Sequence, residues 1–235
     1  MNIFVTGGTG FIGTPLVKSL KKDGHKILLS KRLENIKDWK NELVDFNPDV
    51  FYHLAWEDIP NYSLDKCLDN LNYSYNLFKV IRETDCNKII STGTCWENRK
   101  TNEPFVCTKR LIREIGDLMF RDRIFIWARL FYVYGKGSRK EKIIQYVIDS
   151  YKNGLNPEIN KPNDTNDYVY IDDVINFLSK AIHIEKSSSY DIGYGECTKN
   201  SEIVAYVYDI LKETGWKPTN NIKDGIRKYV GDLDE

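Results

Sequence analysis

The sequence predicts an α/β fold in which a doubly wound parallel sheet is followed by a small C-terminal lobe. Short apolar runs of strand length alternate with amphipathic stretches of helical length in the N-terminal part of the chain. This alternation is typical of right-handed βαβ units, whose strands lie parallel in one sheet. Beyond residue 137 the alternation loosens, which predicts a second, smaller lobe. The 235 residues are enough to bury a large core.

A glycine cluster follows the first apolar run. Gly7, Gly10 and Gly13 are spaced three apart, between a strand and the start of a helix. In such a turn one glycine permits a backbone conformation closed to residues with a Cβ, one lets a pyrophosphate approach the main chain, and one lets the helix pack closely on the strand. The phosphates would bind the free N–H groups at the start of the helix, so the turn predicts a Rossmann-type dinucleotide site. The residues expected to contact the cofactor here are Gly7, Thr9, Gly10, Phe11, Ile12 and Gly13.

The other elements follow in chain order. Gly24 is a suitable residue to end the first helix. Further strands are expected at residues 26–30, 50–54, 88–91, 124–130, 168–170 and 190–192. Helices are expected at residues 11–23, 36–46, 64–84, 105–120, 141–152, 171–184 and 200–213, followed by an amphipathic tail at 221–230. A polar loop rich in Asn, Pro and Asp is expected at residues 153–166.

The residues after the second strand bear on cofactor choice. In dinucleotide-binding folds an acidic residue here accepts a hydrogen bond from the ribose 2′-hydroxyl, whereas basic residues neutralise a 2′-phosphate. Ser30, Lys31 and Arg32 occupy this position, and no acidic residue does. NADP(H) is therefore the expected cofactor, with NAD(H) as the alternative. A solvated basic turn without a cofactor role is the other interpretation.

Two lobes are expected. Residues 1–135 form the NADP-binding Rossmann core, and residues 165–193 return to it. Residues 136–164 and 194–235 form the small substrate-binding lobe. No stretch has the composition of a linker between domains.

Composition excludes several classes of partner. Basic and acidic residues balance at 34 each, so neither nucleic acid nor a membrane surface is an expected partner. No apolar run approaches the roughly 20 residues needed to cross a bilayer, and no signal peptide is expected. The five cysteines are scattered and form no C-x-x-C pair, so no metal site or disulfide framework is expected. A reducing cytoplasm is the expected location.

Further motifs follow at the ends of later strands. The third strand ends in H-L-A at residues 53–55, Asn70 lies on the next helix, and Thr92 ends the fourth strand. Longer motifs are R-L-F-Y-V-Y-G, D-Y-V-Y-I-D-D-V and G-W-K-P, at residues 129–135, 167–174 and 215–218. Together with T-G-G-T-G-F-I-G, and in this order, they resemble the extended short-chain dehydrogenase/reductase (NAD-dependent epimerase/dehydratase) family that modifies nucleotide sugars.

The resemblance implies further contacts to cofactor and substrate. Cofactor contacts are expected from Leu54, Ala55, Asn70, Lys109, Phe131 and Val133. Contacts to a nucleotide sugar are expected from Thr94, Tyr132 and Asn166. Trp56 is expected to join them from the carboxyl edge of the sheet, and Arg139 and Lys142 through their charges at the start of the second lobe. Tyr132 and Asn166 replace an asparagine and an arginine of the family motifs. A core tryptophan at position 56 and solvated charges at positions 139 and 142 are the alternatives.

The catalytic motif departs from the family. Thr92 matches the catalytic Ser/Thr, but the family's Tyr-x-x-x-Lys is Phe105-Val106-Cys107-Thr108-Lys109 in this chain. In the family the lysine holds the nicotinamide ribose and lowers the tyrosine pKa, and the tyrosine exchanges a proton with the substrate oxygen. Phenylalanine has the shape but no proton, and losing a general acid costs on the order of 10²–10⁴ in rate.

Two explanations of Phe105 stay open. One is a Tyr→Phe substitution made to trap a complex, with an active natural enzyme. The other is a natural phenylalanine, in a non-catalytic binder or in an enzyme that takes its proton elsewhere. Thr92, Tyr73 and a bound water are conceivable donors, and the sequence does not rank them.

Within the family, P-F-V-C-T-K-R-L-I-R-E-I-G and the Lys31-Arg32 pair look most like the CDP-abequose synthase-like reductases of 4-keto-6-deoxy sugars. Between Arg32 and Val50 the chain is short by a helix and a strand, as in dTDP-4-dehydrorhamnose reductases. The usual insertion between Leu211 and Trp216 is missing. A homodimer is implied by analogy with the family.

Three functions are therefore weighed. The first is an NADPH-dependent reductase of a nucleotide-activated 4-keto-6-deoxy sugar, with hydride going to the C4 ketone. The second is an NAD(P)-dependent nucleotide-sugar epimerase or dehydratase, which recycles its cofactor. The third is a non-catalytic NADP-binding regulatory subunit, with which Phe105 is consistent.

Overall fold

A computed structural model describes residues 1–213 in two units. Unit 1 consists of Met1–Val133 and Val169–Gly193. Unit 2 consists of Tyr134–Tyr168 and the chain from Tyr194 onward. The motif at residues 215–218 and the tail expected at 221–230 lie outside the described residues. No helix within residues 1–213 is long and apolar enough to cross a membrane.

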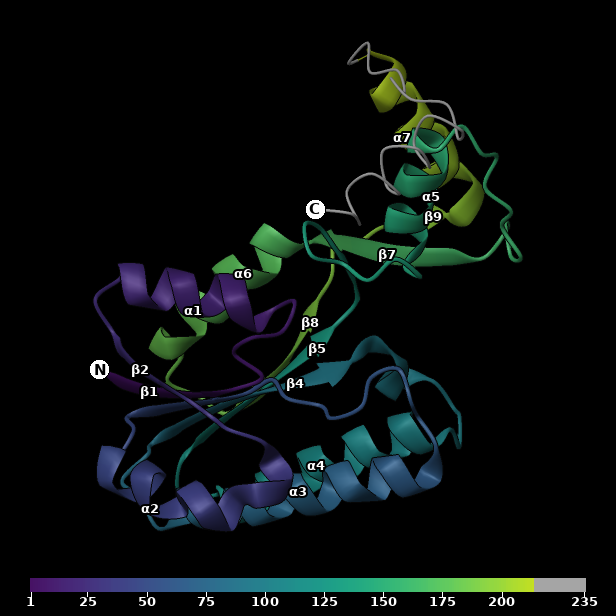
Figure 1. The fold of residues 1–235 in the computed structure, drawn as a ribbon. Helices are drawn as coiled ribbons and strands as arrows, with labels where there is room; N and C mark the ends of the chain where they lie inside the picture. Colours follow the sequence, from purple (N-terminus) through teal and green to yellow (C-terminus); the bar gives the residue numbers. More distant parts are fainter. Residues whose placement is uncertain (214–235) are drawn as a thin grey trace, which may run out of the picture. The chain divides into compact units, whose positions relative to one another are not determined.

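Unit 1 is built on a six-stranded sheet whose strands all run parallel (Figure 1). Its strands are β1 (Asn2–Thr6), β2 (Lys26–Leu29), β3 (Val50–His53), β4 (Lys88–Thr94), β5 (Ile124–Leu130) and β8 (Ser188–Ile192). They lie in the order β2-β1-β3-β4-β5-β8. Both faces are covered, so the central strands are apolar on both sides. In β1, Ile3 and Val5 face one core cluster and Phe4 faces the other.

Helices cover both faces of this sheet (Figure 1). α1 (Gly13–Lys22) and α6 (Ile171–Lys180) lie on one face, above a mainly aliphatic cluster. α2 (Ile36–Phe46), α3 (Leu64–Arg82) and α4 (Pro104–Met119) lie on the other. Their cluster is strongly aromatic and contains Phe4, Trp39, Phe51, Phe78, Phe120, Phe125 and Trp127. The doubly wound fold predicted from the alternation of strands and helices is confirmed.

The sheet ends at β2. A common doubly wound order, 3-2-1-4-5-6, has one more strand outside the second. Here α2 leads directly from β2 to β3, so β2 is an edge strand, in agreement with the shortness expected between Arg32 and Val50. The chain leaves β1 toward β2 on one side and returns to β3 on the other. Such a switch point opens a crevice beyond the carboxyl ends of β1 and β3, where this fold class binds ligands.

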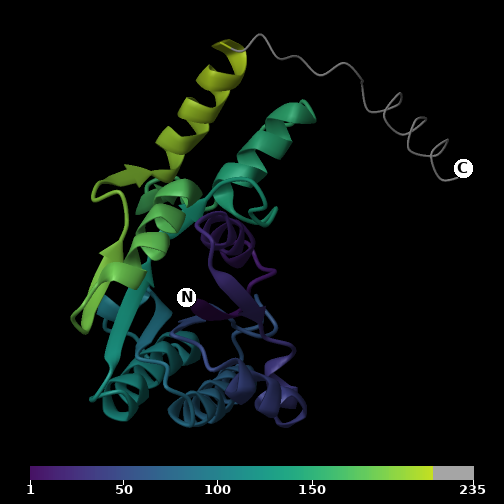
Figure 2. The same cartoon turned by 90° about the vertical axis from the view of Figure 1, so that its left-hand side faces the viewer.

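A second sheet has the order β6-β7-β9. Its strands are β6 (Tyr132–Tyr134), β7 (Thr165–Tyr170) and β9 (Cys197–Lys199), and β7 and β9 pair antiparallel. In unit 2, α5 (Ile143–Lys152) and α7 (Asn200–Glu213) lie side by side (Figure 2), with the rings of Tyr151 and Tyr208 4.8 Å apart.

Several element bounds differ from expectation. The strand expected at 88–91 continues to Thr94, because its polar end pairs with β5 as far as Leu130. β7 begins at Thr165, so the expected polar loop is shorter. β6 and β9 were not predicted, since three residues are too few to show a period. The helix expected at 171–184 ends at Lys180 and continues as a 3₁₀ turn, Ala181–His183. Two further 3₁₀ turns are η1 (Leu33–Asn35) and η2 (Cys95–Asn98).

Candidate functional site

The glycine turn lies tightly against the end of β3. Gly7 has φ +69°, and a Cβ there would lie 2.9 Å from the backbone nitrogen of Ala55. A Cβ on Gly13 would collide with the carbonyl oxygen of Gly7. Because glycine has no Cβ, α1 can start directly beneath the turn. The Gly10 N–H donates to that same oxygen at 3.0 Å and closes the turn. The structure therefore provides a backbone cradle that side chains would fill, and a dinucleotide pyrophosphate fits it.

A chain of buried hydrogen bonds holds β1, β3 and α3 together below the turn. The Thr6 Oγ1 lies 3.0 Å from His53 Nδ1, and His53 Nε2 lies 2.9 Å from the Ser74 Oγ. Because Ser74 gives its proton to the Asn70 carbonyl oxygen, His53 Nε2 is the donor to Ser74 and Nδ1 accepts from Thr6. Burial lowers the pKa of His53 to about 3. His53 is therefore a neutral structural residue.

Asn70 holds the loop that follows β3. Its Oδ1 accepts from the Glu57 N–H at 2.7 Å, and its Nδ2 donates to the carbonyl oxygens of Glu57 at 3.2 Å and Lys66 at 2.8 Å. The side chain is buried, and all these partners are backbone atoms. A contact from Asn70 to the cofactor stays a prediction.

The basic pair after β2 is engaged by carboxylates. Lys31 Nζ lies 2.8 Å from Glu42 Oε2, and Arg32 Nη1 lies 3.1 Å from Glu57 Oε2. Arg32 and Glu57 line a polar cavity of about 290 Å³ together with Tyr73. Exposed ion pairs contribute less than about 1 kcal/mol to stability. The basic residues and their carboxylate partners could therefore exchange these contacts for contacts to a ribose or its phosphate. The sequence reasoning missed Glu57, which follows the third strand rather than the second.

Lys109 is buried at the carboxyl end of β4. Its Nζ donates to the Thr92 carbonyl oxygen at 2.9 Å and lies 4.8 Å from the centroid of the Trp56 ring. Burial lowers the Lys109 pKa to about 8, while the negative charge of Glu97 acts in the opposite direction. The Thr92 hydroxyl donates to the His53 carbonyl oxygen at 3.4 Å. The structure thus brings Thr92, Trp56 and Lys109 together.

An aromatic cluster surrounds position 105. The Phe105 ring meets Trp56 edge-on at a centroid distance of 4.8 Å, and Tyr62 at 4.7 Å with a tilt of 47°. The Trp56 Nε1 is buried and has no hydrogen-bond partner in the described chain. A buried donor without an acceptor suits a ligand oxygen at this place. Tyr62 was not singled out from the sequence, and its place between β3 and α3 was the only available signal.

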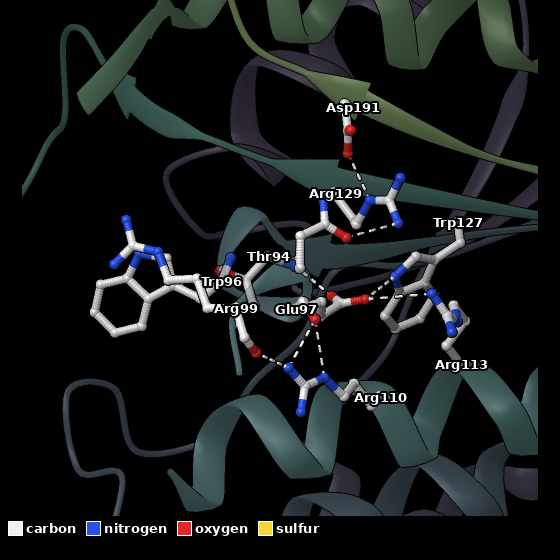
Figure 3. A network of polar contacts seen from close by, with 10 residues as sticks. Thr94, Trp96, Glu97, Arg99, Arg110, Arg113, Trp127, Arg129 and Asp191 are labelled. Atoms are coloured by element: carbon white, nitrogen blue, oxygen red, sulfur yellow. Dashed lines mark hydrogen bonds and ion pairs between the residues drawn. The ribbon is translucent and has the colours of Figure 1, made fainter. Parts of the chain in front are cut away.

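Glu97 connects the end of β4 to β5 and α4 (Figure 3). Its buried carboxylate accepts from the Thr94 N–H at 2.6 Å and from the Trp127 Nε1 at 2.8 Å. Arg113 lies 4.0 Å away. A Cβ on Gly93 would collide with the carboxylate and the indole, so this packing requires glycine there. The network fixes the backbone from which Thr92 and Thr94 project.

A second set of contacts fixes the η2 turn (Figure 3). The Arg110 guanidinium donates to the carbonyl oxygen of Glu97 at 2.9 and 2.7 Å, and also to that of Arg99. Arg129 donates to Asp191 at 2.5 Å and to Asn98 at 3.3 Å. The segment after β4 is thereby tied to α4, β5 and β8.

The other predicted residues fall in two places. In unit 1, Phe131 and Val133 pack on the aliphatic cluster, and the Tyr132 hydroxyl accepts from Trp96 Nε1 at 3.0 Å. In unit 2, Asn166 Nδ2 donates to Asn200 Oδ1 at 3.2 Å. Also in unit 2, Arg139 Nη1 is buried without a hydrogen-bond partner among residues 1–213. In the same range, no group of three or more His, Cys, Asp or Glu residues could hold a metal ion.

Comparison with known proteins places this geometry in a family. A model of the "NAD dependent epimerase/dehydratase family" matches residues 3–193. CDP-abequose synthase of Salmonella typhimurium is 23% identical, over 97% of this chain and 97% of its own length. The dTDP-4-dehydro-6-deoxyglucose reductase of Escherichia coli is 24% identical, over 97% of this chain and 96% of its own.

Solved structures show the same fold. UDP-glucose 4-epimerase of Thermotoga maritima, solved with UDP-glucose, superposes with a TM-score of 0.80 at 19% identity, and all of both chains is covered. UDP-glucose 4-epimerase of Thermus thermophilus, solved with NAD, gives a TM-score of 0.75 at 18% identity, over 97% of each chain.

Proposed function

This chain belongs to the NAD dependent epimerase/dehydratase family of nucleotide-sugar oxidoreductases, and on that premise we propose that it is an NADPH-dependent reductase of a nucleotide-activated 4-keto-6-deoxy sugar. Two of the relatives that match nearly end to end, a CDP-abequose synthase and a dTDP-4-dehydro-6-deoxyglucose reductase, favour this substrate class. The observation that carries the proposal is the buried ammonium of Lys109, which is held at Thr92 one helical turn from position 105.

Each part of the site has a task in such a reaction. The bound nicotinamide supplies the hydride to the C4 ketone. The glycine turn binds the pyrophosphate through backbone N–H groups. Lys109 holds the nicotinamide ribose, and its pKa of about 8 keeps it mostly protonated at neutral pH. The Thr92 hydroxyl has only a long bond to His53, so it can turn to the ketone oxygen.

Cofactor choice is proposed to depend on Lys31 and Arg32. Their cationic groups are exposed at the end of β2 and form only surface ion pairs with Glu42 and Glu57. A 2′-phosphate can therefore replace these carboxylates as their partner. Glu57 supports the alternative, because a carboxylate beside Arg32 can accept from a 2′-hydroxyl. We therefore propose NADPH as the preferred cofactor and NADH as a weaker one.

Contacts to a nucleotide sugar are proposed for each unit by itself. In unit 2, the buried, unpartnered nitrogen of Arg139 suits an anionic diphosphate, with Lys142 and Asn166 as further contacts. In unit 1, the buried Trp56 indole N–H suits a sugar oxygen, with Thr94 and Tyr132 as further contacts.

No cysteine of the described chain is in a disulfide, which fits a proposed cytoplasmic location.

A homodimer is proposed through α3 and α4. These helices pack on each other and expose apolar side chains, namely Leu64, Leu68, Tyr75, Leu111 and Leu118. On α3 these positions follow helical spacing, and such a stripe is self-complementary across a two-fold axis. A second copy of this chain is therefore the proposed partner. Leu68→Arg should yield a monomer in size-exclusion chromatography, whereas the exposed change Leu155→Arg in unit 2 should not.

The reductase is tested by following NADPH with CDP- and dTDP-linked 4-keto-6-deoxy sugars. One NADPH should be oxidised for each sugar reduced, and Lys109→Met should abolish turnover. Turnover without net oxidation would indicate an epimerase or dehydratase. If neither the natural chain nor Phe105→Tyr turns over any of these sugars while both bind NADPH, the chain is a non-catalytic subunit.

A further inference from the structure

We propose that Tyr62 supplies the proton that Phe105 lacks and is the general acid of this reduction. The inference rests on the proposed reductase function. Reduction of a ketone needs a proton donor beside the carbonyl oxygen, and Phe105 occupies the donor's position in the family motif. Another acidic hydrogen must therefore reach the same place.

Tyr62 packs directly on the ring at that position. The centroids of Tyr62 and Phe105 are 4.7 Å apart, and Phe105 also meets Trp56 at 4.8 Å. The ammonium of Lys109 lies 4.8 Å from the same Trp56 ring. These four side chains form one continuous cluster in unit 1. A phenol is thus present beside the Phe105 ring, but it comes from the loop after β3 instead of from α4.

The Tyr62 hydroxyl is accessible for the task. The residue is 40% exposed, and nothing in the described chain hydrogen-bonds its hydroxyl. Only its backbone carbonyl is engaged, by the Cys67 thiol at 3.6 Å. The loop starts at the carboxyl edge of the sheet, where doubly wound folds bind ligands. Because water reaches the side chain, the phenol can be reprotonated after each turnover.

The other conceivable donors are less suitable. The Thr92 hydroxyl is buried away from water, which would have to return its proton, and an aliphatic alcohol is a much weaker acid than a phenol. Tyr73 lines the cavity that contains Arg32, and burial and nearby carboxylates raise its pKa. Tyr73 thus lies beside Arg32 and Glu57, whereas Tyr62 contacts Phe105 in the cluster that contains Lys109. Tyr62 is therefore the tyrosine that shares a cluster with the buried lysine.

The step balances with a reduced nicotinamide dinucleotide as the reductant. Hydride adds to the ketone carbon, and the electron pair of the carbonyl π bond moves to oxygen. That oxygen takes the phenolic proton of Tyr62, so a new O–H bond forms as the phenol O–H bond breaks. The products are the alcohol and the oxidised dinucleotide, and Tyr62 regains its proton from water.

The test uses the full chain and three variants, Tyr62→Phe, Phe105→Tyr and the exchange Tyr62→Phe/Phe105→Tyr. Tyr62→Phe should lower kcat by about 10²–10⁴. The exchange should restore most of this loss, because it returns a phenol to the family's position. The affinity for NADPH should stay unchanged in all three. Tyr62→Phe should also weaken calorimetric binding of the keto sugar to the NADP⁺ complex by about threefold to tenfold, since one hydrogen bond is lost.

The outcomes separate this inference from the function on which it rests. A Tyr62→Phe chain with the natural kcat overturns the role of Tyr62, and so does a change confined to KM. An inactive chain with Phe105 beside an active Phe105→Tyr variant also overturns it, while supporting the reductase function and its substrate class. If neither chain is active, the reductase function fails as well.

Discussion

The glycine turn and the cluster around Phe105 are neighbours in unit 1, but the turn is formed by backbone atoms and the cluster by side chains. At the turn, a Cβ on Gly7 would touch Ala55, and the site consists of backbone. One residue further on, Trp56 begins the cluster, which consists of side chains packed on Phe105 and Lys109. A Cβ on Gly7 or Gly13 would collide with backbone atoms, whereas the cluster depends on which side chains are present.

This difference explains how one end can match the family while the other departs from it. A backbone site leaves no room for a Cβ, and so the tight turn requires glycine at positions 7 and 13. A phenol, in contrast, can enter an aromatic cluster from more than one position. Exchange of Tyr for Phe at position 105 removes one hydroxyl and leaves the packing with Trp56 and Tyr62 possible.

The largest effect on cofactor affinity should come from a side chain in the turn. Gly7→Ala should weaken NADPH binding by about a hundredfold, because the new Cβ meets the backbone of Ala55 and φ lies at +69°. Strain of this kind costs on the order of 1–3 kcal/mol per residue. Titration of NADPH fluorescence measures the effect.

Gly24→Ala is the matched control. Gly24 has φ +82°, yet a Cβ there meets nothing within 4 Å. It therefore carries the conformational cost without the collision, and NADPH binding should be unchanged. Equal losses in both variants would show that backbone conformation, and not close approach to β3, limits the turn.

Acid should destabilise the support beneath the turn. His53 has a pKa of about 3 when folded and an ordinary pKa of 6.5, so the unfolded chain binds more protons between these values. Stability is full above pH 6.5 and falls as the pH drops toward 3. Between pH 7.5 and pH 5 the loss is about 2 kcal/mol, at about 1.4 kcal/mol per pH unit below 6.5. Urea unfolding of the natural chain and of His53→Asn tests this, because the variant should lose that part of the pH dependence.

The predictability of the site follows the same division. The turn could be expected from the sequence because three glycines and a strand within 13 residues define it locally. The contacts of the cluster could not, because they join distant segments. Tyr62 and Phe105 are 43 positions apart, and Trp56 and Phe105 are 49 apart. The fold was predictable from apolar runs. The strand β9 was not, because it has three residues and follows a bend at Tyr194 and Gly195, whose N–H groups donate to the distant Asp167 carboxylate.

A smaller effect is expected from Glu97→Gln, beside Lys109. The carboxylate raises the Lys109 pKa against the effect of burial, so its removal should lower that pKa further below about 8. The high-pH decline of NADPH affinity should then move to lower pH. One of the two donors, the Thr94 N–H or the Trp127 N–H, also loses its charged acceptor, at about 1–3 kcal/mol of stability. Glu114→Gln is an exposed change on α4, the helix of Lys109, and should alter neither the pH dependence of NADPH affinity nor the stability.

The smallest effect on NADPH affinity is expected at Arg32 and Glu57, after the edge strand β2. Whether the affinity rises or falls is what tests the proposal. Arg32→Gln should weaken NADPH binding, while Glu57→Gln should strengthen it, because the carboxylate competes with a 2′-phosphate for the guanidinium. Exposed charge pairs of this kind contribute up to about 1 kcal/mol, which corresponds to about fivefold in affinity. NADH affinity should fall in Glu57→Gln, which loses the charged acceptor for the 2′-hydroxyl.

Glu42→Gln releases Lys31 in the same way and separates the two basic residues. If it strengthens NADPH binding as much as Glu57→Gln does, the phosphate contacts both cations. If Arg32→Gln and Glu57→Gln both leave the ratio of NADPH to NADH affinity unchanged, the 2′-phosphate is not held beside Arg32. Because the ion pair lies outside both the turn and the cluster, either result changes the proposed cofactor without touching the arguments on Gly7 or Tyr62.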